Sequence, residues 1–113
     1  MTPYKRGDIV LVPFPFSNQA ATKKRPPVVI SSSNYNTASP DVIIMAVTSR
    51  TQSIGPGECM IMDWRTAGLL KPSAVKAAVS TIEQTLVVKR LGKLSDADLL
   101  STGNALKDLL DLN

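Results

Sequence analysis

Two apolar runs joined by a short connection constrain the fold of this chain most. Residues 28–31 and 42–47 are rich in valine and isoleucine, which is typical of β-strands. The connection, residues 32–41, is rich in turn-forming residues and too short for the helical crossover that parallel strands require. We therefore expect the two strands to pair antiparallel, so that the start of the first lies beside the end of the second.

Short apolar runs of the same kind recur along the chain, separated by turn-rich loops. Residues 13–18 include prolines that remove ladder donors, so this segment is predicted as a stiff loop edge. Strands with short connections favour a mainly β fold, a small and strongly bent sheet or barrel, over a parallel βαβ arrangement. We predict a helical turn that stops at Gly68, and further strands at residues 9–12, 58–62, 73–76, 79–82 and 86–88.

The last segment has the pattern of an amphipathic helix. Ser95 followed three residues later by Asp98 is typical of a helix start of the capping-box kind. Leucines then recur at three- and four-residue spacing, from Leu99 to Leu110, with Asp98 and Lys107 among the polar residues predicted on the opposite side. We expect this C-terminal helix to lie on the outside of the β-domain.

Composition excludes several kinds of site. The chain has 113 residues, enough for one domain, 1–113, with a real core. It has no histidine and one cysteine, Cys59, which excludes a Cys/His zinc site, a Ser-His-Asp triad and a disulfide framework. We expect Cys59 to be a buried, inert thiol. There is no signal-peptide or membrane-spanning pattern, so we expect a soluble, cytoplasmic protein. We also expect no metal and no cofactor.

The basic stretch at residues 23–30, Lys-Lys-Arg-Pro-Pro-Val-Val-Ile, is a candidate anion site. The proline pair restricts the backbone before it to extended geometry and stiffens the rim on which Arg25 stands. The alternative is an ordinary solvated basic loop, since a net charge of +4 is only compatible with a polyanionic partner. The antiparallel pairing predicted above places Arg25 next to Thr48 and Ser49. One cation and two hydroxyls would then share one rim of the sheet.

Several motifs stand in order along the chain: Arg6-Gly7-Asp8-Ile9-Val10-Leu11-Val12, Pro13-Phe14-Pro15-Phe16-Ser17, Lys24-Arg25-Pro26-Pro27-Val28-Val29-Ile30-Ser31, Tyr35-Asn36, Val47-Thr48-Ser49, Gly68-Leu69-Leu70-Lys71-Pro72-Ser73 and Arg90-Leu91-Gly92-Lys93-Leu94-Ser95. This ordered set resembles the MazF/PemK toxins of bacterial toxin–antitoxin systems. The resemblance implies an SH3-like barrel of the CcdB/MazF type with a C-terminal helix, working as a homodimer. It also implies an endoribonuclease that cuts single-stranded RNA at short motifs without a metal, with Arg25 and Thr48 as catalytic residues.

The chemistry of RNA self-cleavage suits these residue types. The 2′-hydroxyl attacks the adjacent phosphorus and leaves a 2′,3′-cyclic phosphate and a 5′-hydroxyl end. A fixed guanidinium stabilises the charge that grows on the phosphoryl oxygens, and Thr48, assisted by Ser49, is placed to hold an oxygen or the attacking hydroxyl. Arginine stays protonated under physiological conditions, so we favour electrostatic stabilisation over proton donation.

Loops supply the candidates for reading RNA sequence, because unpaired bases are recognised by stacking and by edge hydrogen bonds. One departure from the family concerns Ala77 and Ala78, which stand where many members carry an acidic segment. Glu83 and Asp63 are the nearest alternative acids by sequence. The predicted substrate-binding residues are Phe16, Ser17, Asn18, Gln19 and Lys24 in the first part of the chain, and Ser49, Arg50 and Gln52 after the strand that ends at residue 47.

Partners and alternatives follow from the same resemblance. It implies a small acidic antitoxin as the cognate partner, and the positive net charge agrees with that. One alternative is a toxin resembling CcdB, which shares the barrel but binds a topoisomerase through its C-terminal helix. The lack of an aromatic residue in 109–113 counts against it. The other alternative is a barrel that binds RNA without cutting it.

Overall fold

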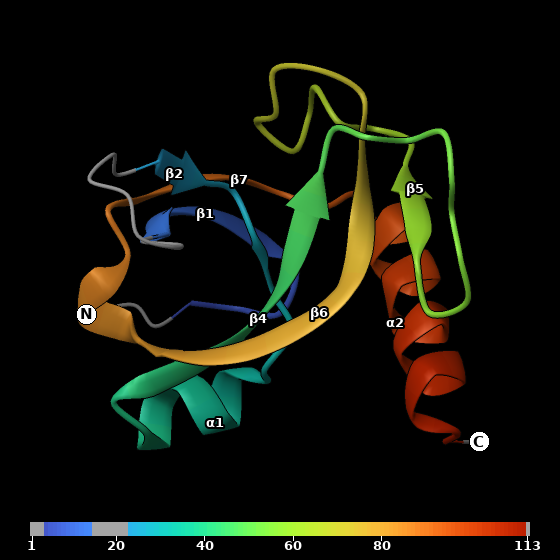
Figure 1. Cartoon of the computed structure of the whole chain (residues 1–113). Helices are drawn as coiled ribbons and strands as arrows, with labels where there is room; N and C mark the ends of the chain where they lie inside the picture. The colour runs from blue at the N-terminus through green and yellow to red at the C-terminus, as the bar shows by residue number, and fades with distance from the viewer. Residues whose placement is uncertain (1–3, 15–22, 113) are drawn as a thin grey trace.

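The structure of the protein is a computed structural model that describes residues 4–14 and 23–112. It is mainly β, with one long helix at the C-terminal end, as predicted (Figure 1). Its elements are β1 (Asp8–Phe14), β2 (Lys23–Arg25), β3 (Val28–Val29), α1 (Ser33–Ala38), β4 (Asp41–Thr48), β5 (Cys59–Ile61), β6 (Ser73–Glu83), the 3-10 helix η1 (Gln84–Leu86), β7 (Lys89–Lys93) and α2 (Asp96–Leu110).

The strands form one antiparallel sheet in the order β2-β1-β3-β4-β6-β5, with β7 added beside β1. The long strands β4 and β6 bend together through the middle of the molecule, and α2 lies next to β5 on one side (Figure 1). The bend lets the sheet enclose its own core. Among the described residues, no helix has the length and apolar character that crossing a bilayer requires.

The predicted antiparallel pairing of β3 and β4 is confirmed. Val28 lies opposite Met45, and Val29 opposite Ile44. The connection was predicted as turns, and that was wrong in detail, because it contains α1. The hydroxyl of Ser32 accepts a hydrogen bond from the Tyr35 N–H at 3.1 Å and begins this helix. The helix is too short to carry the chain across the sheet, so the strands still run antiparallel.

The predicted loop at residues 13–18 was also wrong in its first part, since β1 continues to Phe14 and pairs with β2. Pro13 lies opposite Lys24 in this pairing. β7 pairs with β1 only as far as Leu11, so within the described residues the end of β1 has a partner on one side only. A proline is tolerated there because one face of the backbone needs no ladder partner. The basic stretch thus starts as a strand rather than as a loop.

The two strands predicted at 73–76 and 79–82 are a single strand, β6. It pairs with β4 along its length, from Ala74 opposite Thr48 to Glu83 opposite Asp41, and this pairing overrides the weak strand propensity of its alanines. The strand predicted at 86–88 is wrong, because η1 turns the chain there and β7 begins only at residue 89. Gln84 fixes the turn, its side-chain amide donating to the carbonyls of Asn36, Ser39 and Asp41 at 2.8–3.0 Å.

The core consists of two clusters on the two faces of the sheet. Successive strand residues alternate between them, so that Ile9 and Met45 belong to one cluster, and Val10 and Ile44 to the other. All four side chains are buried, which explains why these strands read as continuous apolar runs. Trp64, in the turn after β5, packs against the first cluster.

Helix α2 begins as predicted, but its faces differ from the prediction. The Ser95 hydroxyl accepts from the Asp98 N–H at 3.1 Å. Asp98 was predicted on the solvent side and is instead 2% exposed. Its carboxylate accepts from the backbone N–H groups of Met62 at 3.0 Å and Asp63 at 2.8 Å, which ties the helix to the turn after β5. Leu100, predicted on the apolar side, is 68% exposed, because the leucine stripe is wider than the surface that the helix covers.

Asp98→Ala is expected to lower the free energy of unfolding by about 2–3 kcal/mol, because it leaves two backbone N–H groups under the helix without an acceptor. Urea denaturation measures the change. Asp108→Ala is the matched control on an exposed position of the same helix and is expected to change stability by less than about 0.5 kcal/mol. Equal stability of the two variants would contradict the anchoring role of Asp98.

Candidate functional site

The strand register brings Arg25 and Thr48 to the same level of the sheet. Arg25 lies three residues before Val28, and Thr48 lies three residues after Met45, its partner. The ladder between β3 and β4 ends at Val28 and Met45, and beyond it Arg25 and Thr48 line the same cavity. Arg25 pairs with Val12 of β1, and Thr48 pairs with Ala74 of β6. Each residue is thus held by a paired strand.

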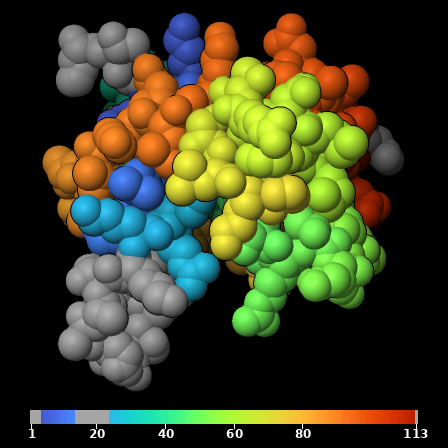
Figure 2. All heavy atoms as spheres, turned by 90° about the horizontal axis from the view of Figure 1, so that it is seen from above, coloured from blue at the N-terminus to red at the C-terminus, as the bar shows by residue number. Residues whose placement is uncertain are grey.

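A cavity of about 420 Å³ opens between these residues and the loop before β6. Figure 2 shows the light-blue segment around Arg25, the green loop after β4 and the yellow segment before β6 reaching the same face of the molecule. Lys24, Arg25 and Lys71 bring positive charge to the cavity. Its remaining polar lining is Thr48, Ser49 and Ser73, and its apolar lining is Leu11, Pro26, Val47, Gly68, Leu69, Leu70 and Leu91.

The hydroxyl of Thr48 is oriented by its own loop. Its Oγ1 accepts a hydrogen bond from the Arg50 N–H at 3.0 Å. A hydroxyl that accepts one bond still carries a proton that it can donate. Thr48 is half-buried, while Arg25 and Arg50 are exposed. The site therefore combines an accessible guanidinium with a hydroxyl whose oxygen is already fixed.

Two further hollows adjoin the first. One, of about 710 Å³, lies along β4 and β6 and is again lined by Arg25 and Thr48, together with Arg50 and Lys76. The other, of about 230 Å³, lies under the loop after β4 and is lined by Thr48, Arg50 and Gln52, among others. Thr48 lines all three hollows.

The residues predicted to bind substrate fall into two groups. Lys24 and Ser49 line the first cavity, and Arg50 and Gln52 line the smaller hollow. The other four, Phe16, Ser17, Asn18 and Gln19, lie outside the residues that the structure describes. Lys71 and Lys76 were not among the sequence candidates. They lie far from Arg25 in sequence, and only the strand order brings them to the same face.

Glu58 is the carboxylate that the sequence reasoning missed. Its two oxygens accept from the Gly55 N–H and the Ala77 N–H, both at 3.0 Å. These hydrogen bonds, that from Ala77 first, lower the pKa of Glu58 below its ordinary value. Glu58 lines the smallest hollow, together with Thr48. The turn at 55–57 was visible in the sequence, but the contact with Ala77 was not, since it crosses between strands.

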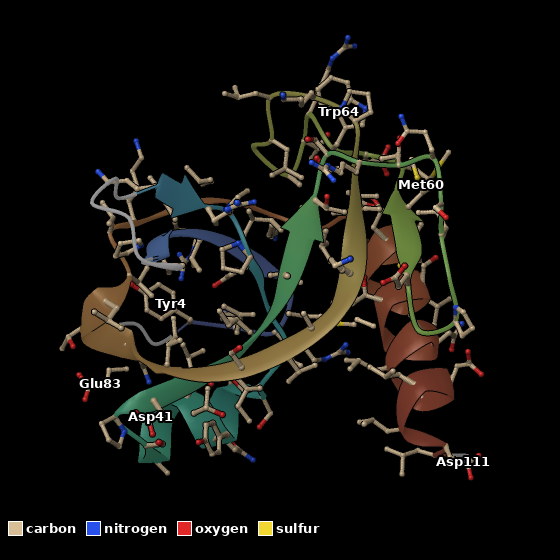
Figure 3. The ribbon with its side chains drawn as sticks, in the orientation of Figure 1. Tyr4, Asp41, Met60, Trp64, Glu83 and Asp111 are labelled. Carbon is tan, nitrogen blue, oxygen red and sulfur yellow. The ribbon has the colours of Figure 1, made fainter. Side chains whose placement is uncertain are left out.

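The two acids suggested by sequence do not line any of these three hollows. Glu83 lies beside Asp41 at the end of the sheet opposite the turn that carries Trp64 (Figure 3). Asp63 is exposed in that turn. Across residues 4–14 and 23–112, no group of three or more His, Cys, Asp or Glu side chains is arranged to hold a metal ion.

Several of the motifs noted in the sequence hold the fold rather than the site. Asp8 is 5% exposed and pairs with Arg90 of β7 at 3.0 Å. Asn36 is buried, and its amide donates to the carbonyls of Tyr4 and Ser31 at 2.7 and 3.1 Å. Cys59 was expected to be buried and is only half-buried, and burial raises the pKa of its thiol.

Comparison with known proteins decides the family. The model of the family described as "PemK-like, MazF-like toxin of type II toxin-antitoxin system" matches residues 5–110. The chain belongs to this family. The match covers nearly the whole chain, including every strand that lines the three hollows. A search of curated proteins found no match.

Solved structures of the same fold agree with this family. An endoribonuclease in complex with its cognate antitoxin, from Mycobacterial species, matches with a TM-score of 0.78 at 18% identity, covering 100% of this chain and 98% of that one. A MazE–MazF structure from Deinococcus radiodurans matches with a TM-score of 0.78 at 20% identity over 100% of both chains. At these identities the likeness shows the fold alone, and the predicted MazF-type fold is confirmed.

Proposed function

We propose that this chain is the toxin of a type II toxin–antitoxin system and acts as an endoribonuclease on single-stranded RNA without a metal. The observation that carries the proposal is the convergence of Arg25 and Thr48 from two paired segments on one cavity. Membership of the toxin family supports it, as does the similar Mycobacterial protein, which is itself an endoribonuclease. Since the chain has no histidine, a two-histidine ribonuclease mechanism is excluded.

In the proposed reaction, the RNA supplies its own nucleophile. The 2′-oxygen bonds to phosphorus and loses its proton to water, while the bond from phosphorus to the 5′-oxygen breaks and that oxygen takes up a proton. Charge develops on the nonbridging oxygens as the new bond forms. The guanidinium of Arg25, held on its stiff rim, stabilises that charge in the transition state more than in the bound substrate.

Thr48 positions the reacting groups in this mechanism. Because its oxygen is fixed by the Arg50 N–H, its own proton is directed to a phosphoryl oxygen or to the 2′-hydroxyl. Ser49, next along the chain and on the same cavity, assists. Lys24 and Lys71 attract the phosphate backbone from the surrounding surface.

Thr48→Val is expected to lower kcat by about 10- to 100-fold, the equivalent of one hydrogen bond to a charged group. Thr48→Ser keeps a hydroxyl and is the matched control, expected to stay within about threefold of the wild type. Initial rates on a fluorescent single-stranded RNA measure both. If the valine variant is as fast as the serine variant, Thr48 has no chemical role.

The same proposal includes the partners and the location of the protein. We infer a homodimer in the cytoplasm, neutralised by an acidic antitoxin whose chain lies across the cationic face in place of RNA. The solved structures of related toxins with antitoxins support the kind of partner. Gel filtration of the purified chain, alone and co-expressed with the adjacent reading frame, tests the dimer and the antitoxin.

Cleavage in the presence of EDTA tests the activity. The wild type is expected to cut single-stranded RNA at a short motif, and a 2′-deoxy nucleotide at the cut site is expected to abolish cleavage. Unchanged cleavage of the 2′-deoxy substrate would contradict the mechanism. RNA that is bound but never cut, at any enzyme concentration, would support a binding barrel instead of an enzyme.

A further inference from the structure

The smallest of the three hollows has the features of a binding pocket for one planar ring. It has a volume of about 230 Å³, below the roughly 300–1,000 Å³ typical of pockets for drug-sized ligands. It lies between the loop after β4 and the start of β6. Its apolar lining comes from Ile54, Ala74 and Val75, and its polar lining from Thr48, Arg50, Gln52, Ser53, Glu58 and Lys76.

Glu58 holds this hollow in shape. One carboxylate oxygen accepts from the Gly55 N–H inside the loop, and the other accepts from the Ala77 N–H of β6. β5 pairs with β6 only from Ser73 to Val75. The next N–H group of β6 on that side, that of Ala77, donates to the side chain of Glu58 instead of to a strand. The loop is thereby fastened to β6 at a defined distance. Its residues Arg50 and Gln52 are then presented to the hollow from a fixed backbone.

The carboxylate also gives the hollow a particular electrostatic character. Arg50 and Lys76 attract the phosphates of a bound strand toward this face. The carboxylate of Glu58 is negatively charged, so it repels a phosphate from the hollow itself. It accepts hydrogen bonds and cannot donate them. Because backbone hydrogen bonds lower its pKa, Glu58 stays ionised at neutral pH. Each oxygen accepts one backbone hydrogen bond and has a further lone pair for a ligand.

We propose that this hollow seats an unpaired nucleobase next to the cleaved phosphate, and that Glu58 selects a base that carries an exocyclic amino group. This inference rests on the proposed ribonuclease function and assigns part of its sequence preference. Thr48 joins the hollow to the cavity of Arg25, which places the base beside the reacting nucleotide. Ile54, which is 40% exposed, offers an apolar surface to the face of the ring, and Gln52 supplies an amide to its edge.

The chemistry of the four bases sets the expected preference. Carboxylates of Asp and Glu accept hydrogen bonds from amino groups on base edges, such as the N4 amino group of cytosine. Adenine and guanine carry amino groups as well. Uracil carries none, and its single ring N–H donor lies between two carbonyl oxygens, which the carboxylate repels. One position of the cut motif should therefore disfavour uracil.

The test compares cut motifs and then removes the amino group from the RNA. A randomised single-stranded RNA pool is cleaved by the wild type and by Glu58→Gln, and the cut ends are sequenced. The wild type is expected to disfavour uracil at one position by about tenfold or more, and Glu58→Gln to lose most of that discrimination. Glu83→Gln, at the far end of β6, is the matched control and should keep the wild-type motif.

A second measurement keeps the test sound if Glu58→Gln is less stable. At the selected position, the preferred base is replaced by its analogue in which hydrogen takes the place of the amino group. Wild-type cleavage is expected to fall about tenfold, whereas Glu58→Gln, assayed below its melting temperature, should show no such loss. Equal losses in both proteins, or a motif with no such position, would overturn the role of Glu58 while leaving the ribonuclease intact. A wild type that cuts no RNA in the pool would overturn both.

Discussion

Arg25→Ala is expected to lower kcat on single-stranded RNA by about 10²- to 10³-fold, with little change in RNA affinity. In the proposed mechanism, the guanidinium acts mainly on the additional charge that the phosphoryl oxygens gain in the transition state, and removing one such preorganised donor has effects of this size. Its place on a stiff, strand-bound rim means that no reorganisation is needed at the moment of reaction. Single-turnover rates, with affinity measured separately on a 2′-deoxy analogue, distinguish the two effects.

Two neighbouring variants sharpen this result. Lys24→Ala removes the adjacent cation and is expected to weaken binding modestly and to reduce its salt dependence, with kcat kept. Arg25→Lys keeps the charge but loses the planar fork that holds phosphate oxygens in pairs, so it should recover only part of the rate. If Arg25→Ala cleaves RNA at the wild-type rate, the assignment of Arg25 is wrong.

Gly92→Ala is expected to lower the free energy of unfolding by about 3 kcal/mol or more. A Cβ on Gly92 would lie 2.5 Å from the carbonyl oxygen of Ala67, and one on Gly68 would lie 2.3 Å from the carbonyl oxygen of Leu91. Both obstacles are backbone atoms, so neither can rotate away. The turn that ends at Gly68 and strand β7 approach each other this closely because both positions are glycines.

Gly103→Ala is the control for this prediction. Gly103 lies within α2, and a Cβ there would meet only the side chain of Arg6 at 3.7 Å, an ordinary contact. Replacing a helical glycine by alanine is expected to stabilise the protein by about 0.5–1 kcal/mol. Urea denaturation of both variants gives the comparison. Opposite signs are expected, and an unchanged stability of Gly92→Ala would contradict the close approach.

The close approach at Gly68 and Gly92 also shapes the candidate site. Gly68, Leu69 and Leu91 all line the cavity that Arg25 and Thr48 share. The wall of the site is therefore the place where the turn and β7 come into backbone contact. A larger residue at Gly92 is expected to damage the cavity together with the fold.

Much of the frame of the site could be predicted from sequence, because it depends on local lengths. The short connection between β3 and β4 required antiparallel pairing, and Arg25 and Thr48 line one cavity beyond the end of that pairing. The start of α2 at Ser95 was visible from its cap for the same reason. Each of these features rests on residues close together in the chain.

The features that sequence reasoning missed depend on distant partners. Asp98 looked like a solvent-facing helix residue. The N–H groups that donate to its carboxylate, those of Met62 and Asp63, lie outside the helix, so the helix pattern could not show them. Glu58 was missed because its role appears only where the Ala77 N–H projects beyond the end of β5. The continuation of β1 through Pro13 likewise depends on where β7 stops. Contacts between elements far apart in the chain, and not local pattern, decided all three.

The end groups of the RNA products, formed in the presence of EDTA, test the central claim most directly. If Arg25 and Thr48 assist attack by the 2′-hydroxyl, each upstream fragment ends in a 2′,3′-cyclic phosphate and each downstream fragment begins with a 5′-hydroxyl. Mass spectrometry identifies the first, and phosphorylation by a polynucleotide kinase without prior phosphatase treatment identifies the second. Fragments that begin with a 5′-phosphate, or the absence of cleavage under these conditions, would contradict the account.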